Sequence, residues 1–212
     1  MKKSIIAGLV LLSFSTMLKA QESGTDTREN IEFGVKAGIN YSNVWDAQGQ
    51  DFVAKGKVGF AGGVFLGIPL GEFFGVQPEA LISQKGFQGS GTLYGFPYSF
   101  SRTTTYFDIP ILFQVKPLQY LTLLAGPEYS YLIHETDNYT YGLNSSEQQQ
   151  AFSNDNIRKN IFGIEMGADV IISHLVFSGR LGWDLQTNNG NGTSSTPRYK
   201  NQWAQLTVGF KI

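Results

Sequence analysis

Apolar and polar residues alternate one by one along much of this chain, and the clearest case is the stretch 106–133. Five apolar side chains in its first half share one parity: Phe107, Ile109, Ile111, Phe113 and Val115. The other parity holds charged and amide side chains as well as Leu112, and the alternation resumes after a short break at 117–120. Because successive side chains point to opposite sides only in a strand, the pattern predicts a β-hairpin with one apolar and one polar face.

The same pattern predicts eight strands of roughly ten residues each. They cover 31–41, 58–68, 74–85, 106–116, 121–133, 159–172, 175–185 and 201–212. Long polar breaks alternate strictly with tight turns, the breaks at 42–57, 86–104, 134–158 and 187–200 and the turns at 69–73, 117–120 and 173–174. Such an array carries its long loops at one end and its tight turns at the other, and closing it removes its edges. The predicted fold is all-β, an eight-stranded antiparallel up-and-down barrel.

Alternation alone does not say which face points outward. A soluble, lipocalin-like barrel turns its apolar face inward around a ligand, whereas an outer-membrane barrel turns it toward lipid. The polar face here is mostly Gly, Ser, Thr, Asn and Gln, with fewer charges than a solvated surface carries. Aromatic residues gather near the strand ends, as in the interfacial girdles of membrane barrels: Phe73, Phe74, Tyr120, Tyr41, Tyr129, Tyr131, Trp183 and Trp203. Both observations predict a transmembrane β-barrel in the outer membrane.

Composition agrees with this prediction and argues against other classes. Charged residues make up 16% of the chain, against about 25% in a typical soluble domain. The chain has no cysteine, which excludes a disulfide framework and a thiolate metal site. Beyond the first twenty residues, no segment holds ~18 apolar residues without a charge, so no transmembrane helix is predicted.

The N-terminus reads as a secretory signal, because Lys2 and Lys3 precede a short apolar run at 5–12 and Ala20 marks a plausible cleavage point. Three of the 16 basic residues lie in this signal, so the mature chain carries 13 basic against 17 acidic side chains. This balance argues against nucleic acid as a partner. The expected organisation is a signal peptide (1–20), a flexible lead (21–30) and the barrel (31–212).

Five segments resemble an outer-membrane β-barrel family of Bacteroidota that includes PorT-like proteins. They are FGVKAGINYSNV (33–44), VQPEALISQKG (76–86), YFDIPILFQVKP (106–117), LLAGPEYSYLI (123–133) and LTVGFKI (206–212). The family keeps a proline after an acidic and a hydrophobic residue in its fourth strand, matched here by Asp108, Ile109 and Pro110. The resemblance implies a membrane barrel and, through PorT, a link to protein secretion. Pro78, Pro110 and Pro127 each remove a ladder donor from a predicted strand, which counts against the barrel unless local bulges absorb them.

If the polar face lines the lumen, its charges must pair, because an unpaired buried ion costs several kcal/mol. With a two-residue turn at Ser173–His174, Arg180 lies opposite Gly167, and Glu165 and Asp169 are its diagonal neighbours. We therefore expect an ion cluster of Arg180 with these two acids. The other members of the expected lumen network are Glu79, Lys85, Asp108, Lys116 and Glu128. Asp108 and Glu128 would need a cation if they approach each other.

Catalysis finds little support in the sequence. Ser130 and His134 share a parity, but four residues of strand rise separate them by ~13 Å, too far for a nucleophile and its base. His174 lies in a turn at the opposite end, so the two histidines do not form a metal site. We expect no enzyme, no metal and no cofactor. Four aromatic residues of the predicted loop 86–104 are candidate contacts with a partner, the alternative being a solvated connector: Tyr94, Phe96, Tyr98 and Phe100.

The sequence therefore predicts a small, monomeric barrel in outer-membrane lipid with a polar, plugged lumen. Its expected role is structural or interaction at the cell envelope, with envelope or secretion-system proteins as partners. A narrow ion or small-solute channel is the main alternative, although eight strands leave a lumen that side chains just fill. A soluble lipocalin-like ligand carrier is the second.

Overall fold

The computed structural model describes residues 28–46, 54–93, 96–141, 157–190 and 199–212. The predicted signal peptide and residues 21–27 of the predicted lead lie outside this part of the chain. Among the described residues, no helix is long and apolar enough to cross a membrane.

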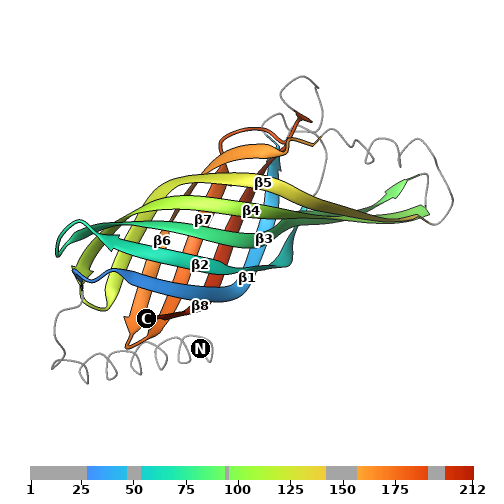
Figure 1. Cartoon of the computed structure of the whole chain (residues 1–212). Helices are drawn as coiled ribbons and strands as arrows, with labels where there is room; N and C mark the ends of the chain where they lie inside the picture. The colour runs from blue at the N-terminus through green and yellow to red at the C-terminus, as the bar shows by residue number, and fades with distance from the viewer. Residues whose placement is uncertain (1–27, 47–53, 94–95, 142–156, 191–198) are drawn as a thin grey trace, which may run out of the picture.

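Eight strands form one closed sheet in which each strand pairs antiparallel with its sequence neighbours and the last strand pairs with the first (Figure 1). The strands are β1 (Glu32–Asp46), β2 (Lys55–Pro69), β3 (Phe74–Leu93), β4 (Phe96–Leu118), β5 (Leu121–Tyr141), β6 (Asn160–Ile172), β7 (Leu175–Asp184) and β8 (Tyr199–Lys211). The seam between β1 and β8 is paired from Gly34 opposite Lys211 to Asp46 opposite Tyr199. The predicted eight-stranded antiparallel barrel is confirmed.

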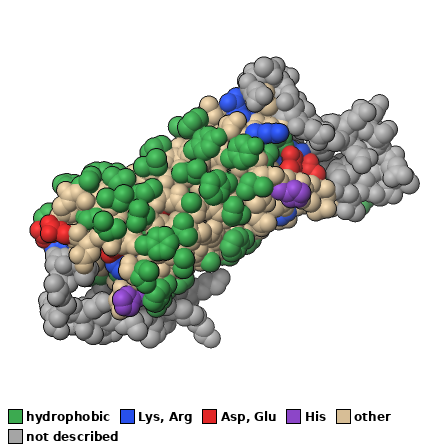
Figure 2. All heavy atoms as spheres, viewed as in Figure 1, with side chains coloured by type: hydrophobic (Ala, Val, Ile, Leu, Met, Phe, Trp, Pro, Cys, Tyr) green, Lys and Arg blue, Asp and Glu red, His purple; other side chains and the backbone are tan. Residues whose placement is uncertain are grey.

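The apolar parity of the strands points out of the barrel. Ile111 and Phe113 are 50% and 47% exposed, whereas Asp108 and Gln114 beside them on β4 are 1% and 2% exposed. Figure 2 shows the result on the face of the barrel in view, where hydrophobic side chains are spread over the surface. An apolar outside around a polar interior is the arrangement of a barrel in lipid, so the predicted orientation is confirmed. A soluble carrier with an apolar interior does not fit it.

Three neighbouring strands continue far past the others and form an arm, which we define as residues 86–93, 96–105 and 134–141 (Figure 1). β3, β4 and β5 contain 20, 23 and 21 residues, about twice the 9–11 that a membrane strand needs. The predicted breaks at 86–104 and from His134 onward are therefore wrong in extent, because strand pairing runs through them. A strand beyond the membrane does not face lipid, so its outer face carries polar side chains and lacks the apolar alternation on which the prediction rested.

The three prolines inside strands leave the register of the sheet unchanged. Pro78 pairs opposite Ile111, and the same register continues on both sides of it; the pairings around Pro110 and Pro127 are equally regular. Register shifts occur elsewhere, near Gly56–Ala61 in β2 and at two places between β4 and β5. The bulges expected at the prolines are thus absent there, since a proline removes one donor while the neighbouring bonds hold the ladder.

The β6–β7 connection is the predicted two-residue turn. Ile172 pairs with Leu175, and Gly167 lies opposite Arg180, so the predicted register of this hairpin is confirmed. Ser173 has a φ of 57°, the left-handed conformation that tight hairpin turns require.

Candidate functional site: the charged lumen

Besides Lys116, which lies near the turn end, nine charged side chains of the described residues lie inside the barrel, each with no more than 5% of its surface exposed. We call them the lumen cluster: Lys36, Lys85, Arg180, Glu79, Asp108, Glu128, Glu165, Asp169 and Asp184. They project from β1, β3, β4, β5, β6 and β7. Three are cations and six are acids, so their contacts decide which of the buried acids are paired with a cation.

Arg180 on β7 is the centre of one half of the cluster. Its Nη1 donates to Asp169 Oδ1 at 2.6 Å, and its Nε lies 3.2 Å from Glu165 Oε1. The structure thus brings together the three residues that the hairpin register placed as neighbours. It adds Glu79 of β3, whose Oε1 lies 3.6 Å from Arg180 Nη2. Gly167 leaves room for this side chain, because a Cβ there would lie 2.8 Å from Arg180 Cδ.

Glu79 connects this half to β1, two strands away from β3 in the sheet. It forms an ion pair with Lys36 of β1, and it accepts a hydrogen bond of 2.7 Å from Gln77 Nε2. Gln77 in turn accepts one of 2.6 Å from Gln114 of β4. The parity of Lys36 puts it on the polar face, but no sequence signal pairs β1 with β3, since the two strands are not adjacent in the sheet.

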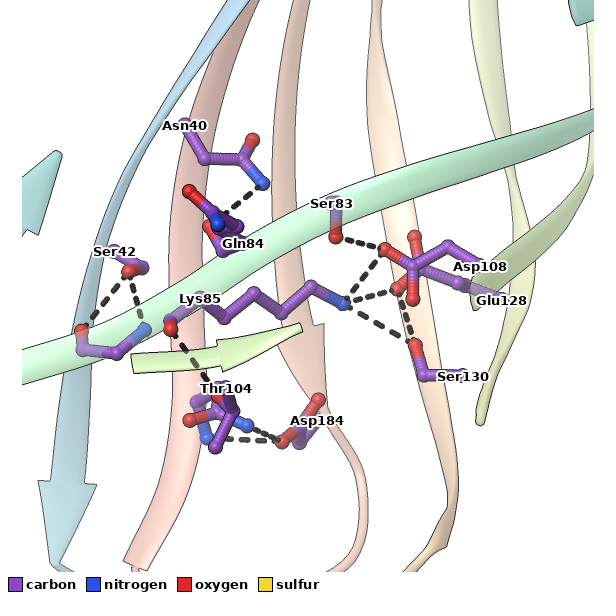
Figure 3. Close-up of polar contacts among 12 residues, drawn as sticks. Asn40, Ser42, Ser83, Gln84, Lys85, Thr104, Asp108, Glu128, Ser130 and Asp184 are labelled. Atoms are coloured by element: carbon purple, nitrogen blue, oxygen red, sulfur yellow. Dashed lines mark hydrogen bonds and ion pairs between the residues drawn. The ribbon is translucent and has the colours of Figure 1, made fainter. Parts of the chain in front are cut away.

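Lys85 of β3 is the centre of the other half and reaches across the lumen (Figure 3). Its Nζ donates to Glu128 Oε1 at 2.7 Å and to Ser130 Oγ at 3.2 Å, and it lies 3.2 Å from Asp108 Oδ2. Ser83 also donates to Asp108. The structure therefore brings Asp108 and Glu128 together and supplies their cation as Lys85.

An aromatic wall backs the Lys85 ammonium group, which lies 3.7 Å from the ring centroid of Trp203 and 5.2 Å from that of Tyr106. Trp203 is 4% exposed, so its prediction as an outward girdle residue is wrong. Its parity is that of Gln205, which points inward, and this signal identifies it in the sequence. Gly182 makes the space, because a Cβ there would lie 2.2 Å from the Trp203 ring.

Asp184 and Lys116 lie at the margins of the network. Asp184 Oδ2 accepts hydrogen bonds from the backbone N and from Nδ2 of Asn201, at 3.0 and 2.6 Å. Lys116, predicted as a network member, is buried near the turn end of the barrel, where its Nζ donates to the Arg28 carbonyl oxygen at 2.9 Å. The Arg28 side chain pairs with Glu72 and lies over the Phe73 ring.

An apolar layer closes the lumen at the end from which the arm projects. We call Val44, Phe87 and Phe100 the apolar seal; all three are buried, and they pack together with Tyr199 against them. The ring centroids of Phe87 and Phe100 are 5.9 Å apart, and those of Phe87 and Tyr199 are 5.0 Å apart. Phe100 was predicted as an exposed loop contact, which is wrong, because it is 7% exposed and points inward.

Arg102 of β4 caps the seal. Its Nε donates to Asp137 Oδ1 at 2.8 Å, its Nη1 donates to Tyr199 Oη at 3.1 Å, and Glu135 lies 3.1 Å from its Nε. Of the other predicted loop contacts, Tyr94 and the side chains of Phe96 and Tyr98 lie outside the described residues.

The described residues offer no group of three His, Cys, Asp or Glu side chains placed to hold a metal ion. Ser130 and His134 are also engaged separately: Ser130 Oγ donates to Glu128 Oε1 at 2.9 Å, and the His134 ring lies 3.1 Å from Thr136 Oγ1. What the lumen offers chemically is an ion-paired, buried interior with more acids than cations.

The sequence matches the family described as "Outer membrane protein beta-barrel domain" over residues 19–188. The chain belongs to this family. It is accordingly a protein of the outer membrane, and its barrel sits in the membrane lipid. No curated protein matches the sequence.

Three solved structures of outer-membrane barrels are similar to this family member at low identity. Ail of Yersinia pestis, the attachment invasion locus protein, is 11% identical with a TM-score of 0.43, covering 85% of this chain and 98% of that chain. Neisserial surface protein A is 7% identical with a TM-score of 0.48, covering 85% and 97%. OprG from Pseudomonas aeruginosa is 14% identical with a TM-score of 0.44, covering 89% and 99%.

Proposed function

We propose that this protein is a monomeric, non-catalytic outer-membrane barrel whose lumen is plugged, and that it serves a structural or interaction role at the envelope. The filled lumen is the observation that carries the proposal. Arg180 joins β7 to β6 and β3, Lys85 joins β3 to β4 and β5, and Lys36 joins β1 to β3. A solute that passed through would have to break these buried ion pairs and displace the apolar seal.

Conductance of the purified protein in a planar lipid bilayer tests the plug. We expect no stable current steps from the unaltered chain. Lys55→Ala, at an exposed position on β2, serves as the matched control for any substitution of a buried cation. The alternative is a narrow ion path along the lumen cluster, and stable steps that disappear on substitution of Arg180 but persist in the Lys55 variant would establish it and refute the plug.

We further propose that the arm is the surface through which the protein meets its partners. The eight residues Gly86–Leu93 rise ~3.3 Å each, which carries the hairpin tip roughly 25 Å outward. Membrane barrels keep their longer connections on the outside of the cell, so the arm extends away from the envelope. Tyr94, Phe96 and Tyr98 remain the candidate contacts at this tip, and the resemblance to PorT-like proteins makes a secretion-system protein the proposed partner.

Deletion of the gene, followed by comparison of secreted and surface proteins, tests this role. The full chain should restore the profile, and a chain in which Ser90–Ser99 is replaced by Asn-Gly should not. This replacement joins Gly89 to Phe100, which already lie opposite each other, through a two-residue turn. An unchanged profile on deletion would refute the secretion link. Restoration of the profile by the shortened chain would refute the proposal that the arm contacts the partner.

A further inference from the structure

One carboxyl group of the lumen cluster, that of Glu165, has no hydrogen-bond donor among the described residues. Glu165 is 0% exposed, and neither of its oxygens accepts a hydrogen bond from the residues that the structure describes. Arg180 Nε lies 3.2 Å from Glu165, but the same guanidinium group also contacts Asp169 and Glu79. The remaining acids of the cluster each accept at least one hydrogen bond: Glu79, Asp108, Glu128, Asp169 and Asp184.

The groups that face Glu165 come from four strands. They are Arg180 of β7, Glu128 of β5, Glu79 of β3 and Lys36 of β1. Glu128 of β5 and Glu165 of β6 are diagonal neighbours on the inward face, because Glu128 pairs with Gly163 and Glu165 pairs with Gly126, and this brings their carboxyl groups within reach of each other. Ionised carboxylates are acceptors only, so this contact is attractive only when one of the two carries a proton.

The total charge of the lumen cluster also requires that at least one of its acids carries a proton. With every group ionised, the six acids would face the three cations of the cluster and the buried Lys116, which would leave two excess negative charges in an interior closed at one end by the apolar seal. Each uncompensated buried charge costs several kcal/mol, and a buried acid avoids this by taking up a proton. Around Glu128 lie Lys85, Asp108 and Asp184 besides Glu165, and the donors Lys85 and Ser130 hold it as a carboxylate. The proton therefore belongs on Glu165.

We propose that Glu165 and Glu128 form a buried proton-binding site, in which neutral Glu165 donates its proton to ionised Glu128. The ligand is a proton taken from solvent; no other bond forms or breaks, and its release leaves one more negative charge in the lumen. The site makes the charge of the interior depend on pH. The proposal goes beyond the plugged lumen, since it holds whether or not the barrel conducts ions.

Carbon-13 labelling of the glutamate carboxyl groups tests the site directly in the folded protein in detergent micelles. One glutamate resonance should remain that of a protonated acid at pH 7. It should disappear in Glu165→Gln and persist in Glu29→Gln, which alters an exposed acid near the turn end. Normal ionisation of every glutamate carboxyl in the unaltered chain would overturn the proposal, and this result does not depend on whether a variant folds.

The pH dependence of unfolding gives a second test. In the unfolded chain Glu165 ionises near pH ~4.3, whereas the folded barrel keeps its proton, so unfolding above that pH releases one proton and rising pH favours the unfolded state. The unfolding equilibrium constant of the unaltered chain, relative to that of Glu165→Gln, should therefore rise about tenfold per pH unit from pH 5 to 7. Parallel profiles for the two proteins would contradict the proton site.

Discussion

Replacing Arg180 with alanine tests how much the lumen cluster contributes to the barrel's stability. The change removes the guanidinium group that lies 2.6 Å from Asp169 and 3.2 Å from Glu165. Glu79 loses a contact of 3.6 Å but keeps its ion pair with Lys36. The substitution therefore leaves Asp169 as the acid with the largest loss.

The expected loss in the free energy of unfolding depends on how many buried acids lose their cation. Removing one partner of a buried ion pair costs about 3–5 kcal/mol. The stranded acid can instead take up a proton, which costs about 4 kcal/mol at pH 7 for a carboxyl with an ordinary pKa near 4. If Glu165 already carries a proton, only Asp169 is stranded, and the free energy of unfolding should fall by about 3–5 kcal/mol rather than twice that amount.

Urea unfolding in lipid vesicles, followed by tryptophan fluorescence and by heat-modifiable gel mobility, measures this loss. Lys55→Ala should unfold like the unaltered chain. Because a stranded Asp169 takes up its proton more readily in acid, the deficit of Arg180→Ala should shrink as the pH falls from 7 toward 4. An unchanged urea midpoint at pH 7 would refute the reasoning that the buried ion pairs stabilise the barrel.

Two further substitutions test the packing around the cluster. Gly182→Val should destabilise the barrel by a few kcal/mol in urea unfolding, because its Cβ would lie 2.2 Å from the Trp203 ring, whereas Gly179→Ala, with its nearest contact at 3.8 Å, should be tolerated. Equal effects of the two would show that Trp203 moves freely. Phe87→Ala should cost about 3–5 kcal/mol and open the apolar seal. Acrylamide should then quench Trp203 more strongly in a chain whose other tryptophans are phenylalanine, and unchanged quenching would show that the seal does not close the lumen.

The sequence predicts this fold well because alternation is a direct consequence of strand geometry. It also groups Arg180 with Glu165 and Asp169, since a two-residue turn fixes the register of β6 and β7 across a short hairpin. The contact of Lys85 with Glu128 joins strands that are not neighbours in the sheet. Two register shifts between β4 and β5 further hide it, so local patterning does not reveal this half of the cluster.

The arm and Trp203 are two features that apolar alternation and position along the strand predicted wrongly. Residues 86–105 lack an apolar outward face, since Gln88, Ser90 and Ser99 are exposed there, because these strands pair beyond the lipid, where no apolar outer face is needed. Trp203 was assigned to the girdle because it lies near a strand end, although its parity places it inside. The position of a residue along a strand indicates its depth in the membrane, whereas its parity indicates whether it points inward or outward. When the two disagree, parity determines the side.

The seam between β1 and β8 has a consequence for how the barrel forms and how long it lasts. It pairs Gly34 with Lys211, so its hydrogen bonds join residues from opposite ends of the chain. Such distant contacts carry a large loop-closure entropy and make folding slow. Once the seam is closed, no strand has a free edge within the barrel itself from which unfolding can start. A chain without either terminal strand would expose unpaired backbone groups to lipid at several kcal/mol each. We therefore expect the barrel to assemble late, to unfold as a unit, and to owe its lifetime in the membrane to a kinetic barrier.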